Sequence, residues 1–264
     1  MKKIIIFLSV VILALSFFPE VSISSENQIE MTILYDNYLY KEGLTSDWGF
    51  SCLIKGPPKT ILFDTGTQGH ILFQNIQKLD INPQKVQSIV ISHDHGDHTG
   101  GLIPFLKKNH QVTVYFPDSF PDDFHQRIKA LGAQVVPGSD PQQICKDVYL
   151  TGELGTSIKE QSLILDTDKG LVVITGCSHP GIIKILEQSK EVLQKNIYLV
   201  FGGFHLINKS EEEINEIISR FKELGVTKVG ATHCTGKKAI NLFKKAYKEN
   251  FIQMGVGRVI QIFD

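Results

Sequence analysis

The sequence predicts an α/β (α+β) fold in which two mixed β-sheets pack against each other with helices on their outer sides. Apolar runs of strand length alternate with amphipathic helical segments in both halves of the chain. The chain has 264 residues, 42% of them hydrophobic and 21% charged, which is enough apolar material for a large core. No stretch rich in proline, glycine or serine divides residues 25–264, so we expect them to form one domain.

Residues 1–24 have the pattern of a secretory signal peptide. Lys2 and Lys3 precede the largely apolar span from Ile4 to Phe18, which is shorter than the roughly 20 residues that cross a membrane. Ser22-Ile23-Ser24 supplies small residues for cleavage near Ser24. We therefore expect export to the periplasm or the extracellular space, with an uncleaved N-terminal anchor as the alternative.

The net charge indicates which partners to expect, and the cysteine spacing bears on possible disulfides. A net charge of −1 gives no reason to expect nucleic acid or a strongly anionic surface, so a small-molecule substrate is the expected partner. The four cysteines are scattered and form no C-x-x-C pair. Cys177 and Cys234 both lie beside histidines, so they could be metal ligands, free thiols or a disulfide.

Hydrophobic periodicity and turn residues place the secondary structure. Helices are expected at 71–79, 102–108, 126–131, over Ile182 to Leu186 with Pro180 at the first helical position, after the capping box of Ser210 and Glu213, and at 237–248. Strands are expected at 29–35, 50–54, 60–63, 86–91, 112–116, 134–136, 147–154, 161–166, 171–175, 197–201, 228–231 and 258–263.

The most informative stretch is His93-Asp94-His95-Gly96-Asp97-His98-Thr99-Gly100-Gly101, directly after a predicted buried strand. Carboxylates near a core are costly unless they are paired or bound to metal. Alternate residues of an extended segment share a face, so His93 and His95 can point at one ion. Asp97 and His98 follow a glycine turn and can face a second ion, while Thr99 is placed to cap the next helix.

Three further histidines follow later strands. His179, His205 and His233 each come shortly after a predicted strand ends. Polar residues at successive strand ends are how α/β folds assemble a site at one edge. His205 could therefore donate a proton to a substrate or leaving group, or could be a core histidine without a catalytic role.

The spacing H-x-H-x-D-H resembles the signature of the metallo-β-lactamase superfamily. That resemblance implies an αββα sandwich and one or two divalent metal ions, zinc above all, with manganese or iron as alternatives. It implies that His93 and His95 bind the first ion with a later histidine, and that Asp97, His98 and His233 bind the second. Asp64, in a D-x-G turn, would support the ligands by hydrogen bonds or simply cap the following helix.

Two positions depart from the superfamily pattern. Gly176-Cys177 stands where a G-D turn usually supplies an aspartate that bridges both ions, and Glu160-Gln161-Ser162 stands where an upstream histidine is usual. His179 is the expected substitute for that histidine. Cys177 is either a zinc ligand, since sulfur suits zinc, or a small buried residue beside a water bridge.

Further motifs narrow the resemblance to one branch, which includes the archaeal dihydropterin ribofuranosylaminobenzene phosphate synthase and many uncharacterised bacterial hydrolases. They are Gly-Phe-Ser near residue 49, Phe-Asp-Thr-Gly, Gly-Cys-Ser-His-Pro-Gly, Gly-Gly-Phe-His-Leu and Thr-His-Cys-Thr-Gly. The branch implies a metal-dependent hydrolase, or a related transferase, that uses a metal-bound hydroxide on an ester, phosphoester or other anionic small molecule. Asp97 would orient the hydroxide as well as bind metal.

Two other classes remain as alternatives. A redox protein on the same fold would place a carboxylate where His95 stands and would carry a flavin domain, and neither is present. An exported metal-binding protein without catalysis would explain the missing bridging aspartate, but structural zinc sites usually contain more cysteine. Lys237 and Lys238 at the start of a helix either favour an anionic substrate or form a solvated basic face.

Overall fold

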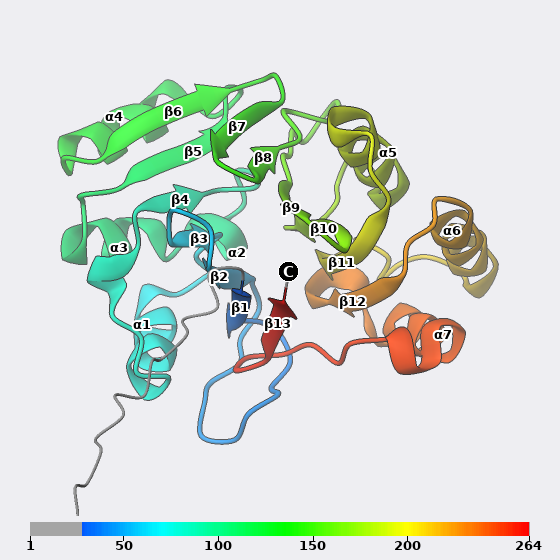
Figure 1. Cartoon of the computed structure of the whole chain (residues 1–264). Helices are drawn as coiled ribbons and strands as arrows, with labels where there is room; N and C mark the ends of the chain where they lie inside the picture. Colours follow the sequence, from blue (N-terminus) through cyan, green and yellow to red (C-terminus); the bar gives the residue numbers. More distant parts are fainter. Residues whose placement is uncertain (1–27, 264) are drawn as a thin grey trace, which may run out of the picture.

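The computed structural model describes residues 28–263, which fold into four layers, helix, sheet, sheet and helix (Figure 1). The signal peptide predicted for residues 1–24 lies outside the described residues. Within residues 28–263 no helix has the length and apolar character needed to span a membrane.

The first sheet has seven strands in the order β13-β1-β2-β3-β4-β5-β6. Its half from β13 to β3 is antiparallel and its half from β3 to β6 is parallel. The strands are β1 (Gln28–Tyr35), β2 (Ser51–Lys55), β3 (Ile61–Phe63), β4 (Ser88–Val90), β5 (Thr113–Pro117), β6 (Gln134–Gly138) and β13 (Val259–Phe263).

The second sheet has six strands in the order β12-β11-β10-β9-β8-β7. Strands β10, β11 and β12 run parallel, and β7 to β10 are antiparallel. They are β7 (Gln142–Cys145), β8 (Val148–Leu150), β9 (Leu163–Thr167), β10 (Gly170–Thr175), β11 (Ile197–Gly203) and β12 (Lys228–Thr232). Both sheets are mixed, as the sequence predicts.

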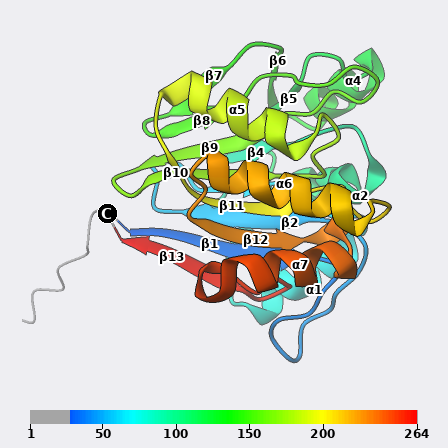
Figure 2. The same cartoon turned by 90° about the vertical axis from the view of Figure 1, so that its right-hand side faces the viewer.

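Each sheet carries its helices on the outer face. The first sheet packs against α1 (Gly69–Lys78), α3 (Leu102–Lys108) and α4 (Asp122–Ala130), and the second packs against α5 (Ile182–Leu193), α6 (Glu211–Glu223) and α7 (Lys237–Tyr247). Figure 2 shows α5, α6 and α7 lying across the face of the second sheet. The remaining helices are short: α2 (Gly96–Thr99), η1 (Pro83–Lys85), η2 (His233–Thr235) and η3 (Lys248–Asn250).

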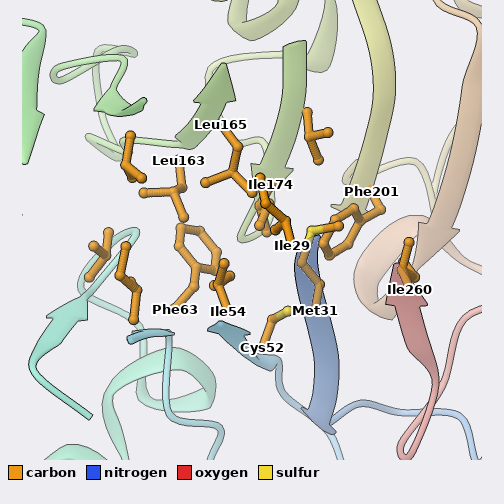
Figure 3. Packing of buried hydrophobic residues seen from close by; sticks show 14 of the residues in the cluster. Ile29, Met31, Cys52, Ile54, Phe63, Leu163, Leu165, Ile174, Phe201 and Ile260 are labelled. Atoms are coloured by element: carbon orange, nitrogen blue, oxygen red, sulfur yellow. The ribbon is translucent and has the colours of Figure 1, made fainter. Parts of the chain in front are cut away.

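Apolar side chains fill the space between the sheets (Figure 3). In β3, Ile61 and Phe63 point toward the second sheet and Leu62 points toward the helices. In β10, Val172 and Val173 likewise face opposite layers. Strands covered on both faces need apolar residues at every position, which explains their unbroken hydrophobic runs. Burying one such side chain contributes about 1.5–3 kcal/mol.

Three local predictions were wrong. Strand β7 was not predicted, because Gln142-Gln143-Ile144-Cys145 has little apolar character. Thr99 does not cap α3: it ends α2 and donates from its hydroxyl to the His95 carbonyl, while Gly101 precedes α3. Helix α5 begins at Ile182 after Gly181, so Pro180 lies outside it rather than in its first turn.

Candidate metal centre

The parallel strands of both sheets end at the same edge of the sandwich, and the loops that follow them carry the predicted site residues. The loops follow β3, β4, β10, β11 and β12, and the end of β1 joins them with Asp36 and Asn37. The chain therefore brings together side chains that lie up to 196 positions apart in sequence.

The seven predicted metal ligands lie in two adjoining groups. The ligand atoms within each group are all within 4.8 Å of one another. The first group is His93, His95 and His179, and the second is Asp97, His98, Cys177 and His233. The imidazole rings of His93 and His98, one from each group, have centroids 4.2 Å apart. This division is the one that the sequence predicts, with His179 and Cys177 in the positions left open there.

The first group presents nitrogen lone pairs to one point. Ser92 Oγ lies 2.9 Å from His93 Nδ1, and His93 Nε2 lies 3.1 Å from His95 Nδ1. Nε2 of His179 is buried and has no hydrogen-bond partner within residues 28–263. Burial, reinforced by the neighbouring imidazoles, lowers the pKa of His93 well below its ordinary value, and burial lowers that of His179 to about 4. Neutral imidazoles that converge with an unpartnered nitrogen fit a divalent transition metal.

His98 in the second group is oriented by a buried carboxylate. Its Nδ1 lies 2.7 Å from Asp64 Oδ2, and both side chains are fully buried. Asp64 also accepts hydrogen bonds from the backbone N–H and the hydroxyl of Ser92. Burial lowers the pKa of His98, but the Asp64 carboxylate outweighs it and raises that pKa to about 9. Asp64 thus holds the proton on Nδ1 and leaves Nε2 facing the other donors of the group.

Cys177 occupies the centre of the second group. Its sulfur lies 3.2 Å from His98 Nε2 and 3.3 Å from His233 Nε2. Because sulfur, imidazole and carboxylate are all zinc ligands, Cys177 completes a four-donor set where the superfamily pattern has an aspartate. The second group therefore still has four donors, although Cys177 replaces the usual aspartate.

Asp97 and His233 are held by residues that sequence reasoning did not single out. Trp48 donates from Nε1 to Asp97 Oδ2 at 2.8 Å, and that oxygen lies 3.4 Å from His233 Nε2. His233 Nδ1 lies 2.9 Å from Asn37 Oδ1, which also accepts from the Gly49 N–H. Burial raises the pKa of Asp97, but hydrogen bonding to His233 and the nearby His98 outweigh it and lower that pKa.

Glu160 positions the loop that carries Cys177 and His179. Its fully buried carboxylate accepts hydrogen bonds from the backbone N–H groups of Cys177, Ser178 and His179 at 2.8–2.9 Å. Burial raises the pKa of Glu160 to about 7 in spite of these bonds. Glu160 stands where the superfamily pattern usually has a histidine. It therefore supports the loop that carries His179, the expected substitute for that histidine.

His205 lies at the outer side of the same edge. It is exposed, and its ring centroid is 4.4 Å from that of His179. It belongs to a third donor group with Cys177 and Cys234, not to either of the first two. The hydrogen bond with Cys234 raises the pKa of His205 and burial opposes that rise. The structure thus places the predicted catalytic histidine beside the first group, at the surface.

Metal uptake by the second group is expected to release a proton. With a pKa near 9, His98 is protonated at neutral pH in the metal-free protein, and that proton must leave when Nε2 binds an ion. The proton of His98 alone makes the affinity rise by up to about tenfold per pH unit between about pH 6 and about pH 9, and the proton of the Cys177 thiol, which is also lost on binding, makes the dependence steeper. Calorimetric titrations with zinc in two buffers of different ionisation enthalpy measure the protons released. An affinity that stays constant over this range would contradict the assigned state of His98.

Comparisons with known proteins agree with the resemblance that the motifs of the sequence indicate. A family model of the metallo-beta-lactamase superfamily matches residues 49–181. The 7,8-dihydropterin-6-methyl-4-(beta-D-ribofuranosyl)-aminobenzene-5'-phosphate synthase of Methanocaldococcus jannaschii is 31% identical, with 91% of this chain and 99% of that protein covered. An uncharacterised protein of the same archaeon is 30% identical, with 87% of this chain and 99% of its own length covered.

Solved structures share the architecture. Tm1679, a metal-dependent hydrolase of the beta-lactamase superfamily, matches with a TM-score of 0.74 at 29% identity, over 89% of this chain and 100% of that one. YhfI from Bacillus subtilis, a metallo-beta-lactamase fold protein, matches with a TM-score of 0.66 at 16% identity, over 88% and 99% of the two chains. The αββα sandwich and the branch resemblance are thereby confirmed. The chain belongs to the metallo-β-lactamase superfamily.

Proposed function

We propose that this protein is a metal-dependent hydrolase, or a related transferase, that acts on an ester, phosphoester or other anionic small molecule. The observation that carries the proposal is the pair of adjoining donor groups at one edge of the sandwich. His95, Asp97 and His179 are half-buried, so both groups can be reached from solvent. Zinc is the ion that nitrogen, sulfur and carboxylate donors favour, with manganese or iron as alternatives.

The chemistry follows from what these groups would hold. Divalent cations held by these groups would supply acidification of a nearby water and polarisation of an ester or phosphoryl oxygen. Asp97, whose pKa is lowered by His233 and His98 against the effect of burial, stays ionised and can accept a hydrogen bond from the attacking water. His205, exposed and with a raised pKa, can donate a proton to the leaving group.

Two findings support an anionic substrate. The archaeal relative is named for a product that is a 5'-phosphate. In this chain, α7 begins with the exposed Lys237 and Lys238 just after η2, has no acidic residue in its first turn and has no side-chain cap. Free N–H groups and positive charge at a helix start favour an anion. Whether the acceptor is water or a second substrate distinguishes hydrolase from transferase.

Metal removal tests the proposal. Turnover of an ester or phosphoester by the wild-type protein should disappear after chelation and return when zinc or manganese is added. His95→Ala should not recover, because one donor of the first group is gone. Activity that persists in the chelated protein would overturn the proposal.

Trp48 offers a direct report of substrate binding. It is the only tryptophan of the sequence, its side chain is 48% exposed, and its ring centroid lies 5.3 Å from that of His233. A molecule bound over the donor groups would cover the indole, so we expect its fluorescence to change on titration with substrate or product. Trp48→Phe should lose the signal and still bind. Binding seen by calorimetry without any change in wild-type fluorescence would place the substrate elsewhere.

A further inference from the structure

A third donor group lies beside the two groups of the proposed metal centre. It consists of Cys177, His205 and Cys234, whose ligand atoms are all within 4.8 Å of one another. Both cysteines are buried and, within residues 28–263, neither forms a disulfide. Cys234 has no place in the catalytic proposal, although its thiol is at the same edge.

We propose that Cys177, Cys234 and His205 form a binding site for a soft metal cation, which shares Cys177 with the second group and adds Cys234 and His205. Two thiolates and one imidazole select soft ions such as Cd²⁺ or Cu⁺ over hard oxygen-seeking ions. Zinc–sulfur bonds of about 2.3 Å in a tetrahedral site place two sulfur ligands roughly 3.8 Å apart, within the observed limit. Each thiol releases its proton to solvent as its thiolate binds.

The backbone around Cys234 leaves room for its thiol beside Cys177 and His205. Gly203 faces it: a Cβ at that position would lie 2.6 Å from Cys234 Sγ and 3.0 Å from His233 Cδ2. His205 and His233, on either side, adopt left-handed backbone with φ of 53° and 51°. Non-glycine residues held in this region cost free energy and cluster at functional sites. The two loops are therefore shaped to bring a thiol and an imidazole together.

Occupation of this site would act on the proposed reaction. Cys177 belongs to both the second and the third group, and His205 is the proton donor proposed above. An ion held by Cys177, Cys234 and His205 would engage the sulfur of Cys177 and occupy the imidazole of His205. Soft cations should therefore inhibit the enzyme while the histidines of the first group remain available.

Cobalt and cadmium absorption tests the site independently of activity. Metal-free protein, kept reduced with a phosphine, is titrated with Co²⁺ or Cd²⁺, and the thiolate-to-metal charge-transfer band is recorded. We expect a band with the intensity of two thiolates in the wild type and about half of it in Cys234→Ser. Cys145→Ser, a half-buried cysteine outside all three groups, is the control and should match the wild type.

Two further variants make the result unambiguous. His205→Ala changes an exposed side chain, so it should fold, and it should weaken Cd²⁺ binding by roughly tenfold or more. His93→Ala removes a donor of the first group and should leave the two-thiolate band intact. A full band in Cys234→Ser, or unchanged Cd²⁺ affinity in His205→Ala, would overturn the third site. The loss of metal from His93→Ala bears on the proposed catalytic centre alone.

Discussion

Replacing Asp64 with asparagine is expected to empty the second metal position and to lower the free energy of unfolding by about 3 kcal/mol. The carboxylate is fully buried and is the partner of the buried His98 imidazole at 2.7 Å. Asparagine matches its size and can adopt its left-handed backbone (φ of 54°), so the variant should fold. The stability is lost because the variant lacks the negative charge beside His98 and because one hydrogen bond to His98 is reversed.

The effect on metal binding follows from the tautomer of His98. Aspartate accepts the Nδ1 proton, which leaves the Nε2 lone pair for an ion. The asparagine NH₂ group would donate to Nδ1 instead, and the neutral ring would then carry its proton on Nε2. A protonated Nε2 cannot bind metal, so the second position should lose its ion while His93, His95 and His179 keep theirs.

Asp80→Asn is a matched control for this variant. Asp80 has the same φ of 54° but is exposed, in the turn after α1. It should change neither metal content nor, beyond about 0.5 kcal/mol, the free energy of unfolding. Chemical denaturation and metal analysis of both variants measure the difference. Full metal content in Asp64→Asn would contradict the role given to Asp64.

Glu160→Gln is expected to weaken both metal positions by about 10- to 100-fold and to lower the free energy of unfolding by about 1–3 kcal/mol. The two carboxylate oxygens accept three backbone N–H groups of the loop that carries Cys177 and His179. Glutamine keeps one oxygen and turns an NH₂ group toward an N–H donor, which leaves a buried donor without an acceptor. Cys177 serves the second position and His179 the first, so both should suffer.

Glu153→Gln serves as the control for that substitution. Glu153 also accepts a backbone N–H, that of Ser119 at 2.6 Å, but at an exposed position. Zinc affinity, measured by competition with a chromophoric chelator, should be unchanged in this control. Wild-type affinity in Glu160→Gln would show that the loop holds its shape without the carboxylate.

The acidity of Glu160 also predicts a pH dependence of stability. Its pKa is raised to about 7 in the folded metal-free protein, from the 4.5 expected of an exposed glutamate. Between these values the folded state binds more protons than the unfolded state, so the contribution of this group to stability falls as pH rises from about 4.5 to about 7. Asp36, whose pKa burial raises to about 6, also titrates in this window in both proteins, so the test is a comparison: the free energy of unfolding of the metal-free wild type should fall relative to that of Glu160→Gln as pH rises.

The sequence predicted the layers of the fold, and it singled out the seven residues that the structure gathers into two donor groups, because both leave local signals. Strands of the β10 kind are apolar at every position, and three histidines with two carboxylates within six positions have few structural explanations. The division into two groups also followed, since His93 and His95 alternate along an extended segment while Asp97 and His98 lie beyond a glycine turn.

The supporting residues could not be predicted in the same way, because their roles depend on the packing of the two sheets. Asn37 and Trp48 lie in a loop of ordinary composition, and only the folded chain brings them to His233 and Asp97. Glu160 is 17 residues from Cys177 along the chain and meets its N–H only where β9 begins beside the end of β10. Hydrogen bonds of this kind join separate strand ends, and no sequence period marks them.

Metal content measures directly whether each of the two adjoining donor groups holds an ion. We would purify wild type, His179→Ala and His233→Ala and measure metal per chain by elemental mass spectrometry after equilibration with zinc. We expect about two ions in the wild type and about one in each variant, since His179 and His233 belong to different groups. No bound metal in the folded wild-type protein, or wild-type metal content in both variants, would contradict this expectation.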